Sequence, residues 1–368
     1  MDFALSEEQV AVRDLAAQIF EGKASVARVK EVEGTPERVD RELWRELARA
    51  NLLGIALPED VGGSGLGMVE LCLVLEQQGR RVAPVPLWPT LILGALPLAE
   101  FGSPEQRHTW LPGVAGGEVI LTAALDEGGA ADPRRPQAKA SAEGRLTGTK
   151  LSVPAAHVAA RVLVPATDED GAVSVYLVDP AGPGAALEHA ETTSRQIHSH
   201  LTLDAAAGEV LGQAGQGARI VSWLLDRAMV GLAAIQVGVC EEAVRVAAEY
   251  TSNRRQFGRP LSSFQGAALK AADAYIDTEA IRVTMLEAAW RLAEGLDGSQ
   301  QAEVAKWWAA EAGQRVVHTT QHLHGGMGAD IDYPVHRYFL WGKQIETMLG
   351  GPSATLAALG QRLAAASP

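Results

Sequence analysis

Three long apolar-periodic segments in the C-terminal half constrain the fold of this chain most strongly. They cover residues 215–252, 263–295 and 299–323, and a shorter segment, 334–364, is broken near Gly350-Gly351-Pro352. Helices of this kind bury their apolar stripes on one another, because an isolated helix is only marginally stable in water. The pattern therefore predicts a C-terminal four-helix bundle.

The rest of the chain changes character twice. Residues 1–115 are predicted to be mostly helical, and Ser6, followed by two glutamates and a glutamine, is typical of a helix start. Residues 116–213 contain short β-branched or apolar runs separated by Gly, Pro and Asp clusters, which predicts a small β-barrel or sandwich. We therefore expect an α+β fold, mostly α, with domains at 1–115, 116–213 and 214–368.

The composition excludes several classes of function. The 368-residue chain has a formal net charge of −13 at pH 7, so it offers no basic surface for phosphates and no nucleic-acid partner is expected. It contains no uninterrupted apolar run of about 18 residues, so no membrane association is expected. Its N-terminal segment lacks the basic and apolar regions of a secretory signal. The prediction is a cytoplasmic protein.

The two cysteines, Cys72 and Cys240, are too few for a disulfide framework and lie in apolar, helix-like runs, which predicts buried thiols. His318 and His322 have the spacing of metal ligands on one helix face, and His324 is close. No carboxylate lies in the same turn, and the next one downstream is Asp330. We therefore expect no metal site.

Two segments are more informative about chemistry. Residues 253–260, with the sequence NRRQFGRP, connect two predicted helices. Cations are favourable at a helix C-terminus by themselves, but an arginine pair beside an aromatic ring and a turn glycine would also bind a phosphate or pyrophosphate. Residues 321–328, QHLHGGMG, would form a helix C-cap or a bare backbone that a flat or phosphorylated ligand can approach.

With these motifs the chain resembles the acyl-CoA dehydrogenases over essentially its whole length. The loop at 58–67, PEDVGGSGLG, is similar to the P-E-x-x-G-G-x-G-x-G of that family, and Arg254-x-x-Phe257-Gly258 is similar to its R-x-x-F-G. The run at 324–328, HGGMG, resembles part of its Q-x-x-G-G-x-G element. The resemblance implies FAD as cofactor and an acyl-CoA thioester as substrate.

The resemblance also implies which residues contact FAD. Arg254 matches the arginine that binds the FAD pyrophosphate, Phe257 lies beside it, and Gln265 matches a glutamine in the following helix. The adenosine end would be held by Gln321 or His322, together with Gly325 and Gly326. The register leaves open whether Gln321 or His322 makes the contact.

The sequence departs from the family where the flavin ring would rest. The family carries T-E-x-x-x-G-S-D and W-I-T-N-G there, whereas this chain has LDEGGAAD at 125–132 and LSVPAA at 151–156. Leu125 removes a hydroxyl, and Pro154 removes both a hydroxyl and a backbone N–H. The aromatic residue that would cover the ring is also missing. The pocket for the flavin ring is therefore predicted to be degenerate.

The catalytic base is the second departure. Proton abstraction next to a thioester needs a carboxylate, which the family carries in a Y-E-G-T segment; here Gly350 stands at that position, and Glu346 is out of register. An alternative family position lies on the first bundle helix, where this chain offers Asp226. We interpret Asp226 rather as a surface charge beside Arg227, and expect the base to come from a partner subunit.

In this family each FAD lies across a subunit interface: the β-domain of one chain holds the flavin ring, and its neighbour holds the pyrophosphate and adenosine. The resemblance implies that this chain keeps the residues for the pyrophosphate and adenosine and lacks those for the ring. It resembles the base-lacking subunit of the actinobacterial heterotetrameric (α2β2) steroid side-chain acyl-CoA dehydrogenases, especially over residues 324–339. The resemblance implies a complementary acyl-CoA dehydrogenase subunit as partner, a steroid side-chain CoA ester from cholesterol-type catabolism as substrate, and electron-transferring flavoprotein as acceptor.

Two alternatives stay open at this point. The first is a self-sufficient homotetrameric dehydrogenase that uses Asp226 as its base. The second is a flavin-free subunit that only stabilises a partner. The retained pyrophosphate motif at Arg254 and Phe257 disfavours the second alternative, because a pure scaffold does not need it.

Overall fold

The structure, a computed structural model, describes residues 4–129 and 132–366. The chain forms two compact units, described separately below. The helical unit comprises Met1–Glu31, Met68–Ala83 and Met229–Pro368, and the β-containing unit comprises Val32–Gly67 and Pro84–Ala228. The predicted fold class is confirmed: helices come first, a β-sheet domain follows, and helices return.

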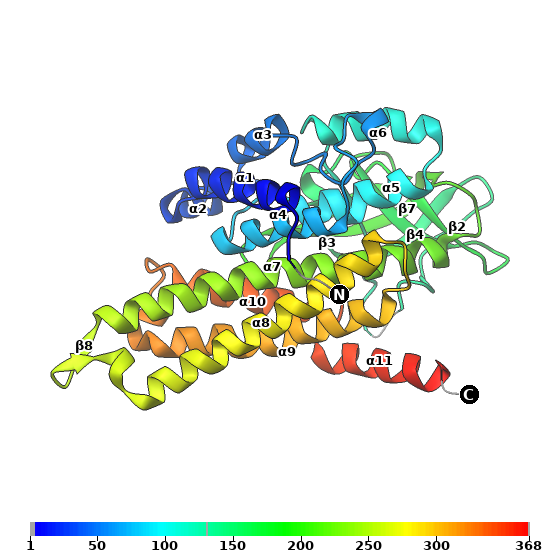
Figure 1. The fold of residues 1–368 in the computed structure, drawn as a ribbon. Coiled ribbons are helices and arrows are strands. Elements are labelled where there is room, and N and C mark those ends of the chain that lie inside the picture. Colours follow the sequence, from blue (N-terminus) through cyan, green and yellow to red (C-terminus); the bar gives the residue numbers. More distant parts are fainter. Residues whose placement is uncertain (1–3, 130–131, 367–368) are drawn as a thin grey trace. The chain divides into compact units, whose positions relative to one another are not determined.

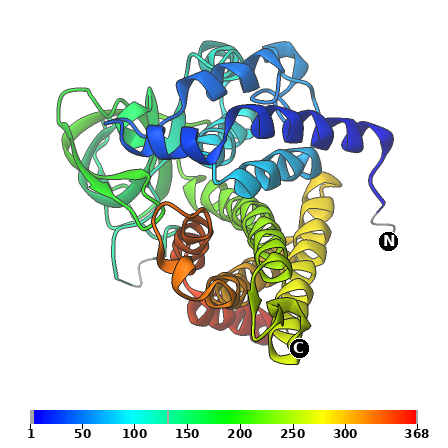
Figure 2. The same ribbon diagram turned by 90° about the vertical axis from the view of Figure 1, so that its left-hand side faces the viewer.

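The helical unit is built on long helices that run side by side (Figures 1 and 2). Its elements are α1 (Glu7–Lys23), α4 (Met68–Arg81), the later part of α7 (Gly217–Asn253), α8 (Gln265–Ala293), α9 (Ser299–Leu323), α10 (Val335–Thr347) and α11 (Pro352–Ala366). The short α2 (Val26–Glu33) follows α1. The break predicted near Gly350-Gly351-Pro352 separates α10 from α11.

Helix α7 supplies much of the core of the helical unit. It is long and apolar enough to cross a membrane by length and composition, but 67% of its most apolar window is buried inside the protein. Such burial is typical of a core helix. Cys240 on this helix and Cys72 on α4 are both fully buried, which confirms the prediction for the two thiols.

The β-containing unit begins with α3 (Arg41–Arg49) and a Gly-rich loop. A β-carbon at Gly63 would lie 2.0 Å from the carbonyl oxygen of Leu57, so this glycine permits a close approach of two backbones. A π-helical segment (Trp88–Ala95), α5 (Leu96–Phe101) and α6 (Pro104–Ala115) follow, and α6 begins at a capping box on Ser103.

The strands of this unit close into a barrel. They are β1 (Leu121–Ala123), β2 (Lys139–Ala140), β3 (Arg145–Pro154), β4 (Arg161–Thr167), β5 (Val173–Val178), β6 (Ala185–Glu191) and β7 (Ile197–Val210). The pairings β4–β2, β2–β3, β3–β7, β7–β5 and β5–β4 return to their starting strand, and β1 pairs in addition with β4 and β6 with β7. Leu146, Val162, Val164 and Leu201 are among the residues that fill its core.

The β3–β7 ladder contains an irregularity that matters below. Its register shifts between Lys150 and Val153, and Ser152 within this bulge has a φ of +48°. A positive φ is uncommon for residues other than glycine and costs free energy unless the surroundings hold it. Bulges re-aim side chains, so the segment that follows Lys150 is directed by this irregularity.

Candidate functional site

The R-x-x-F-G motif forms a hairpin at one end of the helical unit (Figure 1). Strands β8 (Arg255–Gln256) and β9 (Arg259–Pro260) pair around Phe257 and Gly258, whose φ values are +52° and +78°. Positive φ at both central residues is the geometry of the tight turns that suit two-residue hairpins. This turn leaves the Phe257 side chain 91% exposed.

The three arginines of this hairpin differ in what they contact. Arg255 donates from Nη2 to the carbonyl oxygen of Gly258 (3.0 Å), and the guanidinium of Arg259 lies 4.0 Å from the centroid of the Phe264 ring. The Arg254 side chain is exposed and, within residues 4–129 and 132–366, its guanidinium has no hydrogen bond or ion pair. Arg254 is thus the member of the three that is available to an external anion.

Gln265 is the first residue of α8, and its side chain is exposed. The preceding residue, Phe264, provides no side-chain cap, so the first backbone N–H groups of the helix are not capped by it. Uncapped N–H groups at a helix start favour negative charge. Arg254 and the start of α8 therefore present positive potential at the same end of the unit.

The end of α9 supplies the second predicted element. Gln321 donates from Nε2 to the carbonyl oxygen of Gly328 (3.0 Å), whereas His322 is exposed. At both Gly325, whose φ is +58°, and Gly326, a β-carbon would meet no atom within 4 Å. The backbone here is bare and faces open space, which fits the close approach of a flat or phosphorylated ligand.

A partly buried cluster of three aromatic rings, centred on the buried His324, joins these two elements. The His324 ring lies 4.6 Å from that of Tyr250 in the last turns of α7, and 5.2 Å from that of Tyr333. His324 Nδ1 is 2.7 Å from the carbonyl oxygen of Thr320, and burial lowers the pKa of the imidazole. Sequence reasoning missed this stack, although Tyr250 precedes Arg254 by one helical turn and His324 precedes Gly325 directly.

The segment predicted to form the ring pocket belongs to the β-containing unit, and its polar groups are engaged within the chain. Leu125 is buried, and the Asp126 carbonyl accepts a hydrogen bond from the backbone of Leu151 (2.7 Å). The carboxylate of Asp126 accepts one from the backbone N–H of Gly128 (2.7 Å). Ala130 and Ala131, also part of this segment, lie outside the described residues.

Ser152 and two histidines occupy the second part of this pocket. The Ser152 hydroxyl lies 2.9 Å from His198 Nδ1, and its backbone N–H donates to His200 Nδ1 (3.2 Å). Burial lowers the pKa of His198 to about 4, so its ring is neutral at pH 7. Pro154, which has no N–H, lies opposite His198 in the ladder. The family's aromatic and hydroxyl groups are thus replaced by a closed Ser–His network.

A buried ion pair fixes the same region. Lys150 Nζ lies 2.7 Å from Glu127 Oε1, and the two side chains are 1% and 4% exposed. Burial opposes ionisation of Glu127, but hydrogen bonds from Lys150 and from the backbone of Gln137 and Ala138 outweigh it and lower its pKa. This pair ties the segment after Leu125 to β3.

The predicted positions for a catalytic carboxylate are occupied as follows. Gly350 has a φ of +94°, and its carbonyl oxygen, like that of Glu346, accepts a hydrogen bond from the buried Lys306 Nζ (3.0 and 3.2 Å). Burial lowers the pKa of Lys306 to about 8. The Glu346 carboxylate forms an ion pair with Lys343. No carboxylate therefore stands at position 350.

Asp226 lies on α7, half-buried and engaged in an electrostatic interaction. The neighbouring Arg227 guanidinium is 3.5 Å from the centroid of the Trp223 ring. Burial lowers the pKa of Arg227 to about 10, and the negative charge of Asp226 opposes this shift. These contacts favour the interpretation of Asp226 as a charge that compensates Arg227.

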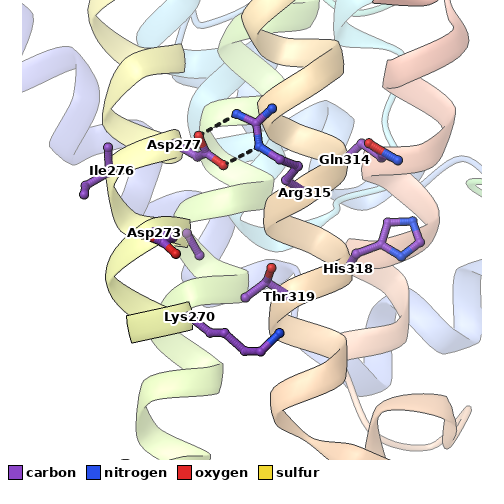
Figure 3. A pocket seen from close by; sticks show the side chains of 9 residues that line it. Lys270, Asp273, Ile276, Asp277, Gln314, Arg315, His318 and Thr319 are labelled. Atoms are coloured by element: carbon purple, nitrogen blue, oxygen red, sulfur yellow. Dashed lines mark hydrogen bonds and ion pairs between the residues drawn. The ribbon is translucent and has the colours of Figure 1, made fainter. Parts of the chain in front are cut away.

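His318 does not form a metal site with its neighbours in the described chain. Its ring lies 4.8 Å from that of Phe339, in an edge-to-face arrangement, and no group of three His, Cys, Asp or Glu residues there is placed to hold a metal ion. His318 instead lines a groove between α8 and α9, together with Lys270, Asp277 and Arg315 (Figure 3).

Comparison with known proteins identifies the class of protein. The family models for the N-terminal and C-terminal domains of acyl-CoA dehydrogenases match residues 6–118 and 215–363. Acyl-CoA dehydrogenase FadE27 of Mycobacterium tuberculosis is 40% identical over 373 aligned residues, which cover 99% of each chain. The chain belongs to the acyl-CoA dehydrogenase family, whose members are FAD-dependent oxidoreductases that act on CH–CH bonds.

Two solved structures are similar to this chain over nearly its whole length. A variant of the Tcur3481-Tcur3483 steroid ACAD is 50% identical, with a TM-score of 0.93, over 98% of this chain and 99% of that chain. The ChsE4-ChsE5 complex from Mycobacterium tuberculosis is 39% identical, with a TM-score of 0.93, over 100% of both chains. Each of these similar structures is named as a pair of proteins.

Proposed function

We propose that this chain is one of two non-identical subunits of an FAD-dependent acyl-CoA dehydrogenase. It would donate the pyrophosphate and adenosine half of the FAD site to a complementary subunit, which supplies the ring pocket and the base. One observation carries the proposal. The Arg254 guanidinium is exposed and has no partner among the described residues, whereas the Ser152 hydroxyl is already hydrogen-bonded to His198 within the chain.

The chain's own residues have defined roles in this proposal. The Arg254 guanidinium neutralises the diphosphate through charge-assisted hydrogen bonds, and Phe257 covers the adenine side. Gly325 and Gly326 let the nucleotide approach the backbone, with Gln265 and either Gln321 or His322 completing the contacts. His322 suits this contact better, because the Gln321 amide already donates to Gly328. When bound, FAD supplies the hydride acceptor for the CH–CH bond.

Residues on the ring side do not fit a flavin. Ser152 and Asp126 have in-chain partners, Pro154 has no N–H to donate, and the Gly350 turn carries no proton acceptor. A homomer of this chain would therefore contain no complete site. The ring pocket and the carboxylate base must come from the complementary subunit.

The similar structures support the finer details of the proposal. Because one of them is a steroid ACAD of two proteins, we infer an α2β2 heterotetramer that acts on a steroid side-chain acyl-CoA in cholesterol catabolism. Electron-transferring flavoprotein is the acceptor that we infer, and the cytoplasm the compartment.

Flavin stoichiometry tests the proposal directly. The chain is purified alone and after co-expression with the product of its neighbouring dehydrogenase gene, and FAD absorbance and native mass are measured. We expect a colourless lone chain and a complex with one FAD per pair of subunits. A lone chain that is a yellow tetramer with one FAD per chain would overturn the proposal.

A further inference from the structure

His324 is a buried residue whose two ring nitrogens have different surroundings. Its side chain is 2% exposed, and Nδ1 lies 2.7 Å from the carbonyl oxygen of Thr320. A carbonyl oxygen only accepts, so Nδ1 carries the proton and donates, and Nε2 keeps a lone pair. Nε2 is buried and has no hydrogen-bond partner in residues 4–129 and 132–366. A buried acceptor without a partner costs free energy, so it needs an explanation.

The bond from His324 to Thr320 helps to fix the end of α9. The last carbonyl groups of a helix have no partner within the helix, and side chains near its end can satisfy them. The backbone N–H of His324 also donates to the carbonyl oxygen of Gln321 (3.2 Å). The next residues form a 3₁₀ turn over Gly325–Ala329. The imidazole therefore sets the place from which the bare glycine backbone starts.

Three rings link this turn to the Arg254 hairpin. The rings of Tyr250, His324 and Tyr333, which we call the ring cluster, contact one another at centroid distances of 4.6, 5.2 and 6.2 Å. Aromatic rings attract one another at such distances. The Tyr250 carbonyl accepts a hydrogen bond from the backbone N–H of Arg254 (2.8 Å). A chain of contacts thus extends from Gly325 through the ring cluster to Arg254.

Such a link matters because the two elements would bind one molecule. Arg254 follows α7, whereas Gly325 and Gly326 follow α9. Under the proposed function they hold the pyrophosphate and the adenosine of the same dinucleotide, so their separation has to match it. A site whose parts are held in place before the ligand arrives loses less conformational entropy on binding. The ring cluster supplies this pre-organisation.

We propose that His324 is a positioning residue for FAD, an inference that rests on the function proposed above. Its neutral ring holds Gly325 and Gly326 in place relative to Arg254. A protonated ring would carry an N–H at Nε2, where the described residues provide no hydrogen-bond partner, and would place a charge in a buried position. Burial lowers the pKa of the imidazole, which keeps the ring neutral at pH 7.

The groups that face His324 are mostly not of the kind that titrates near neutral pH. They are Tyr250 of α7 and Tyr333 before α10, and tyrosine titrates near pH 10. The Glu249 carboxylate of α7, together with burial and Tyr250, raises the pKa of Tyr333. His336 of α10 binds the carbonyl oxygen of Tyr333 through Nδ1 (2.7 Å). A variant of His324 that leaves these groups unchanged therefore isolates its own titration.

The test measures FAD affinity of the co-expressed complex, after removal of its flavin, by fluorescence titration between pH 7 and pH 5. His324→Leu removes the ring and its donor, whereas His324→Phe keeps a ring that does not titrate. The matched control is His318→Leu, because His318 lies earlier on the same helix and contacts the Phe339 ring instead. Native mass and circular dichroism check assembly and folding. His322 is present in every variant, so its titration cancels in the comparison.

We expect His324→Leu to weaken FAD binding at pH 7 about 10–100-fold with unchanged native mass, because two ring contacts and a hydrogen bond are lost. His318→Leu should stay at the wild-type level. As the pH falls from 7 to 5, the wild type should lose about three- to tenfold more affinity than His324→Phe, because only the wild-type ring takes up a proton there.

Each other outcome has a defined meaning. A His324→Leu complex that binds FAD like the wild type overturns the inference, and the proposed function still stands if Arg254→Ala loses flavin. Equal pH profiles for the wild type and His324→Phe would show that the ring only packs, which also overturns it. This comparison remains decisive if His324→Leu does not fold. A wild-type complex that binds no FAD overturns both proposals.

Discussion

The region around Arg254 and the region around Ser152 differ in what their polar groups do. Around Arg254 the side chains are exposed and the backbone at Gly325 and Gly326 is bare, so binding groups are left open. Around Ser152 the hydroxyl is hydrogen-bonded to His198, the backbone N–H of Ser152 donates to His200, and that of Leu151 donates to Asp126. The comparison shows that one fold can leave polar groups open in one region and satisfy them internally in another, and only the open groups can bind a ligand without giving up an internal hydrogen bond.

The largest expected effect is on the free energy of unfolding, through the buried Lys150–Glu127 ion pair. Lys150→Met leaves the Glu127 carboxylate buried without its cation, which should cost about 3–5 kcal/mol of stability. The double variant with Glu127→Leu should recover most of this loss, because no buried charge is left. Urea unfolding of both variants and the wild type measures the effect. Equal stability of Lys150→Met and wild type would show that this ion pair does not stabilise the segment that follows Leu125.

The second effect is a dependence of stability on pH from His198. Its pKa is lowered to about 4 in the folded chain against about 6.5 when unfolded, so the unfolded state takes up the proton first. Stability from this group is fully present above pH 6.5 and is lost as the pH falls towards 4, by about 3 kcal/mol in all.

His198→Gln is the matched variant for this test, because glutamine can still bond to Ser152 but does not titrate. The free energy of unfolding of wild type and variant should converge as the pH falls from 6.5 to 4. Parallel pH profiles for the two proteins would mean that the closed network does not depend on a neutral His198.

The third effect is on FAD affinity and concerns Arg254. Arg254→Ala should weaken FAD binding by the co-expressed complex about 10–100-fold, the worth of about 1.5–3 kcal/mol for hydrogen bonds to a charged group. Arg255→Ala is the control, since Arg255 already donates to Gly258. Fluorescence titration with FAD measures both. Normal flavin affinity in Arg254→Ala would contradict the assignment of Arg254 to the FAD pyrophosphate.

The smallest effect is expected at Asp226. Under the proposed function, Asp226→Asn should leave turnover of the complex nearly unchanged, because the complementary subunit would supply the base. Acyl-CoA oxidation with an artificial electron acceptor measures this, and Asp226→Ala serves as a second variant. A loss of activity with intact flavin content would assign Asp226 as the base and favour a self-sufficient enzyme.

Much of the fold can be predicted from apolar periodicity. The bundle helices begin and end within a few residues of the predicted segments, because their stripes extend over many turns. Strand β6 could not be predicted: most of its residues are exposed, and only its ladder with β7 makes it a strand. The closed barrel likewise depends on pairings between distant segments.

The candidate site could be predicted only in part. The motifs at Arg254 and Gly325 and the departures at Leu125 and Pro154 are visible in the sequence, but the partner of Ser152 is 46 residues away across a bulge.

The turn at Gly350 bears on the history of this chain. A glutamate there would need a backbone at a φ of +94°, which L-residues adopt only at a cost, while Lys306 holds the carbonyl of the same residue. Gly350→Glu alone is therefore not expected to give a working base. Under the proposed function, a return to a self-sufficient enzyme needs changes at this turn and on the Ser152 side together, and each further change on either side adds to their number.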